Sequence, residues 1–127
     1  MTTRKRKYPS GHQKRLKRKA AGRWTEDDER RERERLRKKD ARAYQRRAEM
    51  IDSTKIRLGC ADCGYRAHPA ALHFDHLPGC NKVAAISQLR YGNCPLEKLE
   101  REVAKCEVVC ANCHAIRTVT RRGGSRL

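Results

Sequence analysis

The sequence of 127 residues is long enough for one small domain and an appendage, but too short for a large enzyme core. A hydrophobic content of 37% and a mean hydropathy of −1.00 indicate that only part of the chain buries a core. The net charge of +17 favours a polyanion, DNA or RNA, as the partner. A basic protein that is merely soluble, or associated with ribosomes, is the alternative from charge alone.

The seven cysteines suggest how so small a core is stabilised. Residues 1–23 are basic and contain neither the apolar segment nor the cleavage site of a secretory signal. No apolar run approaches the roughly 18 residues that span a bilayer. We therefore expect a soluble, cytoplasmic protein with no membrane partner, in which paired cysteines bind metal instead of forming disulfides.

Basic residues are concentrated in the N-terminal part of the chain. Residues 1–50 contain 20 Lys and Arg against 8 Asp and Glu, whereas residues 51–127 contain 12 against 7, together with all the cysteines. We expect residues 1–24 to be a disordered basic arm, because few of their side chains are apolar and their charges repel one another.

A charged helix is predicted over residues 25–52. Thr25 and Asp28 resemble a capping box, and acidic residues precede basic ones at a spacing of four, as in Glu34 and Lys38. Apolar residues are too sparse for a coiled coil, so only the last turns are expected to dock on the domain. The helix is either a solvent-exposed spacer or a DNA-contacting element.

The compact part is expected over residues 53–122, followed by a flexible tail at residues 123–127. Turn and periodicity signals predict a cysteine knuckle, a strand, a helical insertion, a second strand, a second knuckle and a helix. The strands are "ALHFDHL" and "CEVVC", and the last helix is "ANCHAIRTVTRR". Within the insertion, helices are expected over Val83–Leu89 and after Pro95. This order predicts an α+β fold.

Two CxxC pairs with 46 residues between them predict a structural zinc site. Two residues between cysteines let both thiolates reach one ion, and four thiolates complete a tetrahedral shell. Gly64 suits the turn of the first pair. The predicted ligands are Cys60, Cys63, Cys110 and Cys113. Four unrelated buried thiols are the alternative. Of the other cysteines, Cys106 is a reserve ligand, and we expect small apolar fillers or free thiols at Cys80, Cys94 and Cys106.

His114 directly follows the second CxxC pair, and three chemistries compete for it. It could be a haem ligand, since CxxCH is the haem-attachment pattern, a zinc ligand, or a ligand of a separate catalytic metal. Four thiolates leave no place for it on the zinc, and haem attachment would need export and an apolar pocket. The cluster "HFDH", residues 73–76, supplies a carboxylate and imidazoles that could bind a divalent ion with it.

The combination of "FDH", a β-region and "VVCANCHAIRT" after a CxxC knuckle resembles the HNH endonucleases, the ββα-metal or His-Me finger nucleases. It is most similar to the small zinc-binding members of bacteriophages, over about residues 60–121. The resemblance implies metal-dependent hydrolysis of DNA phosphodiester bonds, by nicking or double-strand cleavage. It also implies that Asp75 and His114 bind a catalytic divalent metal such as Mg²⁺ or Mn²⁺, and that His76 is the general base. An imidazole with a pKa of about 6.5 can take a proton from water near neutral pH.

The family's middle asparagine has no clear counterpart here. It usually lies about five residues before the second knuckle, where this chain has Lys105. Asn112 is the choice by proximity, although a residue between two zinc ligands could simply face solvent. His73 could approach the metal, orient a phosphate or be a surface residue, and His68 is interpreted as incidental.

DNA is the partner that the resemblance implies. Similar small phage proteins work beside the terminase during genome packaging or act as homing endonucleases, in the cytoplasm of the host cell. A non-catalytic, zinc-ribbon-like nucleic-acid-binding protein is the rival interpretation, and it would need none of Asp75, His76 and His114. Ordinary solvated charge is the alternative for the candidate phosphate contacts. These candidates are Lys82, Arg117, Arg121 and Arg122.

Overall fold

A computed structural model of the chain describes residues 10–123 and combines α-helices with one small β-sheet. The α+β class predicted from the sequence is therefore confirmed at this level. The chain forms two compact units, Met1–Asp40 and Ala41–Leu127, which are described separately. In the part of the chain that the structure describes, every helix is too short or too polar to traverse a bilayer.

The first unit contains helix α1 (Gly11–Ala20), in the segment expected to be a disordered arm. The structure corrects that expectation for this segment, while residues 1–9 lie outside the described residues. Ser10 and Gln13 form a reciprocal capping box, in which Gln13 N–H donates to Ser10 Oγ at 3.3 Å and Ser10 N–H donates to Gln13 Oε1 at 2.9 Å. This cap, and basic residues at the negative end of the helix dipole, oppose the charge repulsion on which the expectation was based.

Helix α2 (Glu26–Leu58) begins where the sequence predicted. Asp28 N–H donates to the Thr25 hydroxyl at 3.2 Å, and Thr25 N–H donates to the Asp28 carboxylate at 3.0 Å. The predicted pair of Glu34 and Lys38 is also present, at 2.7 Å. Such pairs support the exposed part of the helix by about 0.2–0.5 kcal/mol each.

The predicted helix over residues 25–52 is too short, because α2 continues to Leu58. Ile56 in this extension packs against a core cluster of the second unit, so the extension belongs to the domain. The helix ends where Gly59 adopts a φ of +68°, a conformation that favours glycine. The buried side chains of the helix are Arg47, Ala48 and Ile51, all in its second half. This agrees with the prediction that only the last turns dock on the domain.

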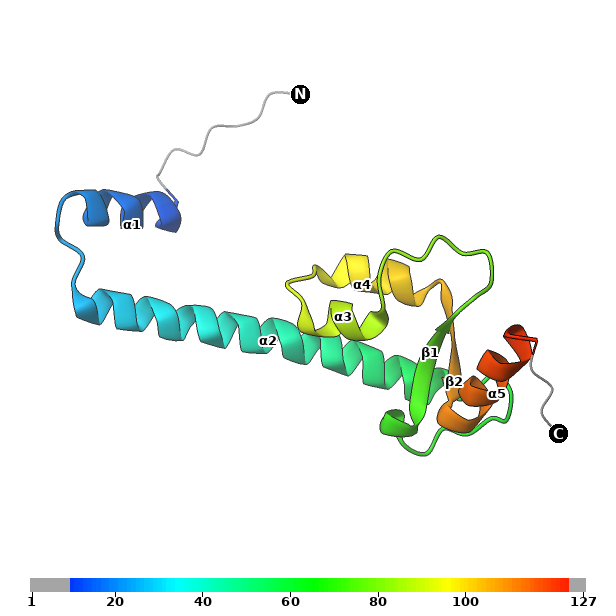
Figure 1. Cartoon of the computed structure of the whole chain (residues 1–127). Coiled ribbons are helices and arrows are strands. Elements are labelled where there is room, and N and C mark those ends of the chain that lie inside the picture. The colour runs from blue at the N-terminus through cyan, green and yellow to red at the C-terminus, as the bar shows by residue number, and fades with distance from the viewer. Residues whose placement is uncertain (1–9, 124–127) are drawn as a thin grey trace, which may run out of the picture. The chain divides into compact units, whose positions relative to one another are not determined.

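The second unit contains a two-stranded antiparallel sheet of β1 (Leu72–His76) and β2 (Cys106–Cys110), close to the predicted strands. A 3-10 turn, Pro69–Ala71, leads into β1. Helix α5 (Ala111–Arg121) follows β2 without a loop and lies beside the sheet (Figure 1). One core cluster surrounds the sheet and comprises Cys60, Leu72, Val108, Val109 and Cys110.

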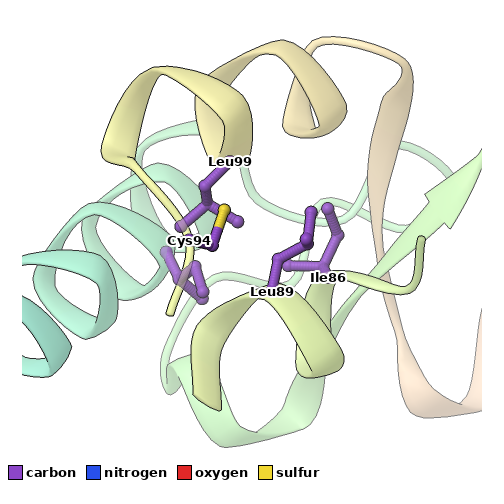
Figure 2. Close-up of a cluster of buried hydrophobic side chains, with 5 residues drawn as sticks. Ile86, Leu89, Cys94 and Leu99 are labelled. Atoms are coloured by element: carbon purple, nitrogen blue, oxygen red, sulfur yellow. The ribbon is translucent and has the colours of Figure 1, made fainter. Parts of the chain in front are cut away.

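Two short helices, α3 (Ile86–Tyr91) and α4 (Leu96–Val103), lie between the strands in sequence. The first begins later than the predicted Val83–Leu89. The N–H groups of Val83 and Ala84, which lie before it, donate to the Glu102 carboxylate at 2.9 and 3.5 Å. Cys94 is a buried filler, as predicted. The apolar sides of α3 and α4 meet α2 in a second core cluster, shown in Figure 2 and formed by Ile51, Ile86, Leu89, Cys94 and Leu99.

Candidate metal centre and adjoining cleft

Four cysteine side chains from the two CxxC knuckles meet in the second unit. Among residues 10–123, no other group of three or more Cys, His, Asp or Glu side chains is arranged closely enough to share an ion. The predicted four-cysteine metal site is thereby confirmed as an arrangement that could hold a metal, and Cys106 is not part of it. The four residues, whose sulfur atoms all lie within 4.8 Å of one another, are Cys60, Cys63, Cys110 and Cys113.

The two knuckles share one local geometry. Cys63 N–H donates to Cys60 Sγ at 3.5 Å, and Cys113 N–H donates to Cys110 Sγ at 3.4 Å. Gly64, with a φ of +79°, closes the first turn. Burial opposes ionisation of the Cys60 thiol, but backbone N–H groups directed at its sulfur more than offset this and lower its pKa to about 6. The Cys110 sulfur, and then burial, raise the pKa of Cys113 in the absence of an ion. Thiolates are the form in which cysteine binds metal, and a bound cation would favour that form at all four sulfurs.

The knuckles are attached to the elements that carry the polar site. Ala61 N–H donates to Val108 O at 2.8 Å, which ties the first knuckle to β2. Cys110 is the N-cap of α5, so the second knuckle forms the first turn of that helix. A metal held by both knuckles would therefore fix α5, and with it His114, against the sheet.

A cleft of about 600 Å³ adjoins the sheet. Asp75 and His76 from β1 and His114 from α5 all line it. Four cations also line the cleft, namely Lys55, Lys82, Arg90 and Arg121. The cleft is thus lined by three of the predicted catalytic residues and by two predicted phosphate contacts, Lys82 and Arg121.

Asp75 is buried, with 6% of its surface exposed, and both of its carboxylate oxygens are paired with arginines. Arg121 donates to both oxygens at 2.8 Å, and Arg117 donates to Oδ2 at 3.0 Å. The hydrogen bonds from Arg121, opposed by burial and assisted by Arg117, hold the pKa of Asp75 below its ordinary value. His114 Nε2 lies 3.9 Å from Asp75 Oδ1. The two predicted metal ligands are therefore adjacent, but the carboxylate already has cationic partners.

Arg117 binds two further carboxylates. It donates to Asp62 through two nitrogens, at 2.6 and 2.7 Å, and its Nη2 lies 2.8 Å from Glu107 Oε2. The bonds to Asp62, and then those to the carboxylate on β1, raise the pKa of this guanidinium. Arg117 is consequently engaged within the protein, whereas Lys82 and Arg122 are exposed. The phosphate-contact role of all these residues stays a prediction.

His76 is held by a carboxylate that the sequence interpretation missed. His76 Nε2 lies 2.9 Å from Oε1 of Glu102, a residue of α4 with only 2% of its surface exposed. A hydrogen bond from Lys105 at 2.8 Å, opposed by burial and assisted by backbone N–H groups and His76, lowers the pKa of Glu102 to about 2. The available signal was a glutamate three residues after Leu99, on the apolar face of the predicted helix.

His73 lies against His114 at the edge of the same site. The two Nδ1 atoms are 3.2 Å apart, and the rings meet edge to face. Burial, and then the proximity of His114, lower the pKa of His73. If His114 Nδ1–H is the donor, its Nε2 carries the lone pair and faces Asp75. Metal-binding histidines usually donate the N–H of the ring nitrogen that does not bind the metal to another protein group, as His114 Nδ1–H would donate to His73 here.

The predicted family asparagine lies away from these residues. Asn112 is exposed in the first turn of α5, and none of the residues lining the cleft is an asparagine. His68 is exposed and accepts a hydrogen bond from Ala70 N–H at 3.1 Å, which agrees with a structural interpretation. The cleft therefore combines Asp75, His76 and His114 without Asn112.

Comparison with known proteins does not assign the chain to a family. No protein-family model matches the sequence, and neither the curated proteins nor the solved structures include a match. The functional conclusion consequently depends on the residues and geometry of the site.

Proposed function

We propose that the protein is a metal-dependent DNA endonuclease of the HNH type, with its active site in the cleft. The observation that carries the proposal is the convergence of Asp75, His76 and His114 beside a four-cysteine cluster. A net charge of +17 supports a nucleic acid as the substrate, because a surface of this kind attracts phosphate backbones.

His76 acts as the general base in this proposal. Its Nε2–H donates to Glu102, so Nδ1 is left to accept a proton from water. The water oxygen then attacks the scissile phosphorus, and the bond from phosphorus to the leaving oxygen breaks. Glu102 is a positioning residue: it selects the tautomer of His76 and stabilises the imidazolium that forms, as carboxylates do in other histidine dyads.

Asp75 and His114 would hold the catalytic divalent metal, which when bound neutralises the charge that develops on the phosphate and the leaving oxygen. Their donor set, a carboxylate oxygen and an imidazole nitrogen 3.9 Å apart, is suitable for such an ion. Arg121 would have to release one oxygen of Asp75, and its guanidinium would then be free to contact phosphate. Either Mg²⁺ or Mn²⁺ is compatible with these donors.

The four-cysteine cluster is proposed to hold a structural Zn²⁺. Four thiolates form a closed tetrahedral shell, in which no position is left for water or substrate. The ion would therefore contribute to folding and to the placement of α5, and the chemistry would belong to the cleft. Removal of this ion is expected to affect stability before it affects any catalytic step.

A second candidate function is favoured by the pairing of Asp75 with arginines. If the interactions of Arg117 and Arg121 with Asp75 are purely structural, the cleft has no carboxylate free for a metal. The protein would then be a non-catalytic nucleic-acid-binding protein organised around the four cysteines. Cleavage activity and metal binding outside the cysteine cluster distinguish the two functions.

A supercoiled plasmid incubated with purified protein and Mg²⁺ or Mn²⁺ tests the proposal. We expect conversion to open-circular or linear DNA, and loss of this conversion in His76→Ala with zinc content and DNA binding retained. His68→Asn is a matched control, because His68 is exposed, lies outside the cleft, and asparagine can preserve its cap. A wild-type protein that binds the plasmid but does not nick it with any divalent metal would support the non-catalytic function.

A further inference from the structure

Tyr44 of α2 and Arg90 and Tyr91 of α3 form a compact group in the second unit. The two tyrosine rings are stacked, with centroids 5.6 Å apart and planes inclined by 28°. The Arg90 guanidinium carbon lies 5.6 Å from the centroid of Tyr44 and 5.8 Å from that of Tyr91. We call these three residues the aromatic platform.

The platform is exposed in a way that packing within the chain does not explain. Tyr91 has 72% of its surface exposed, the largest fraction among the large hydrophobic side chains that are exposed in the described part of the chain. Within residues 10–123, Arg90 Nε has no hydrogen-bond partner although it is buried. The guanidinium is thus placed by the ring faces rather than by a carboxylate.

The platform is held in position by buried interactions. Arg47, with 7% of its surface exposed, donates to Arg90 O at 3.0 Å and to Cys94 O at 3.2 Å. Ile86 and Leu89 anchor α3 in the core cluster shown in Figure 2. A platform fixed in this way loses little conformational entropy when it binds a ligand.

Two of the three platform residues also line the cleft that contains the candidate active site. Arg90 and Tyr91 line the cleft together with Asp75 and His76. Three further cations line the same cleft, namely Lys55, Lys82 and Arg121. A phosphate backbone could follow these cations while one of its bases reaches the exposed tyrosine ring.

We propose that the aromatic platform stacks an unpaired nucleobase, so that the protein prefers single-stranded or locally unpaired DNA to intact duplex. Every base has a π face, so stacking on Tyr91 needs no particular sequence. A base within a duplex already has both faces covered by its neighbours and must be unstacked first. The inference rests on the proposed function for the identity of the polymer, and it adds the class of substrate.

The test compares binding of a short single-stranded oligonucleotide and of its duplex, by fluorescence anisotropy at one fixed salt concentration. The full-length protein is used in the His76→Ala background without divalent metal, so that no cleavage occurs. We expect tighter binding of the single strand, and a loss of about 5- to 150-fold in Tyr91→Ala, the range measured for one stacked base. Tyr91→Phe, which keeps the ring, should bind like the parent protein.

A second measurement does not depend on a variant. An oligonucleotide carrying 2-aminopurine should change its fluorescence when the wild-type protein binds the single strand, and the change should be absent with the fully paired duplex. Unchanged single-strand affinity in a folded Tyr91→Ala protein, or equal fluorescence changes with both DNAs, would overturn the proposal.

The outcomes for the platform and for the nuclease are separable. If the wild-type protein cleaves plasmid and Tyr91→Ala does not change single-strand binding, the platform proposal is wrong and the nuclease proposal stands. If single-strand binding depends on Tyr91 but the wild-type protein does not cleave DNA, the nuclease proposal is wrong and the platform proposal stands.

Discussion

The four-cysteine cluster and the cleft both gather polar groups from distant parts of the sequence, but they differ in how those groups are paired. In the cluster, the sulfur atoms face one another and backbone N–H groups, so an ion can enter without breaking a salt bridge. In the cleft, Arg121 binds both oxygens of Asp75, and Arg117 binds Oδ2 as well. An ion there must compete with a cation that is already present.

This difference suggests that the two sites would respond to metal in different ways. Binding at the cluster is expected to be coupled to folding, because one ion would join two knuckles whose own sulfur contact, from Cys63 to Cys110 at 3.7 Å, is weak. Binding in the cleft would be an exchange, in which a divalent ion replaces an arginine as the partner of Asp75. The cluster should therefore determine stability, and the cleft should determine activity.

The largest expected effect is the loss of a cluster ligand. Cys110→Ser should leave the second unit unfolded, because structural zinc sites contribute about 10–16 kcal/mol and small domains have net stabilities of about 5–15 kcal/mol. Circular dichroism melting and zinc content measure this. Cys80→Ser is the matched control, since Cys80 lies outside the cluster, and it should melt close to the wild type. A Cys110→Ser protein with the wild-type melting temperature would contradict the claim that the cluster determines stability.

The next effect concerns Glu102, which supports the cleft from α4. Its folded-state pKa of about 2 lies below the ordinary value of 4.5, so its charge stabilises the fold above pH 4.5, and this contribution is lost as the pH falls toward 2. Glu102→Gln should lower the free energy of unfolding at neutral pH by an amount on the order of 1–3 kcal/mol, and the melting temperature should fall accordingly. The difference from the wild type should shrink in acid. Equal differences at neutral and acidic pH would show that the charge of Glu102 does not stabilise the fold.

A smaller effect is expected at His73, through its contact with His114. If His73 accepts the Nδ1–H of His114, His73→Ala should weaken Mn²⁺ binding in the cleft by about 10-fold, as for other residues that orient a metal-binding histidine. Titration calorimetry with zinc-loaded protein measures the affinity. His73→Asn, which keeps a polar acceptor, should recover part of it. Identical Mn²⁺ affinities for His73→Ala and the wild type would show that His73 does not position His114.

The smallest effect is predicted for the competing cation. Arg121→Gln should strengthen Mn²⁺ binding by a few-fold, because it frees Asp75 Oδ1 and leaves only the bond from Arg117 to Oδ2. Arg122→Gln removes the same charge from an exposed neighbour and should change little. Weaker Mn²⁺ binding in Arg121→Gln than in Arg122→Gln would mean that Arg121 supports the site rather than blocking it.

The cluster could be predicted from the sequence because CxxC spacing fixes the ligands locally. The two strands and α5 were also predictable, since short apolar runs and turn residues bound them. The pairing of Asp75 with Arg117 and Arg121 was not, because it depends on how α5 lies against β1. Glu102 was missed because its contact with His76, 26 residues away, likewise depends on the tertiary packing that brings α4 close to β1.

The extent of the helices was harder to predict than their existence. The prediction places residues 53–58 in the compact part but outside the helix, because the packing of Ile56 against the sheet cluster cannot be seen in a charged segment. The aromatic platform depends on α2 and α3 meeting, so sequence periodicity gave no sign of the stacking of Tyr44 and Tyr91.

The most direct test of the proposed active site is single-turnover cleavage of an end-labelled oligonucleotide in saturating Mn²⁺. His76→Ala should reduce the rate by about 100-fold or more, the typical contribution of a general base. Added imidazole should restore part of the rate, because it can accept the proton in place of the missing side chain. A His76→Ala protein that cleaves at the wild-type rate would contradict the assignment of the cleft as a catalytic site.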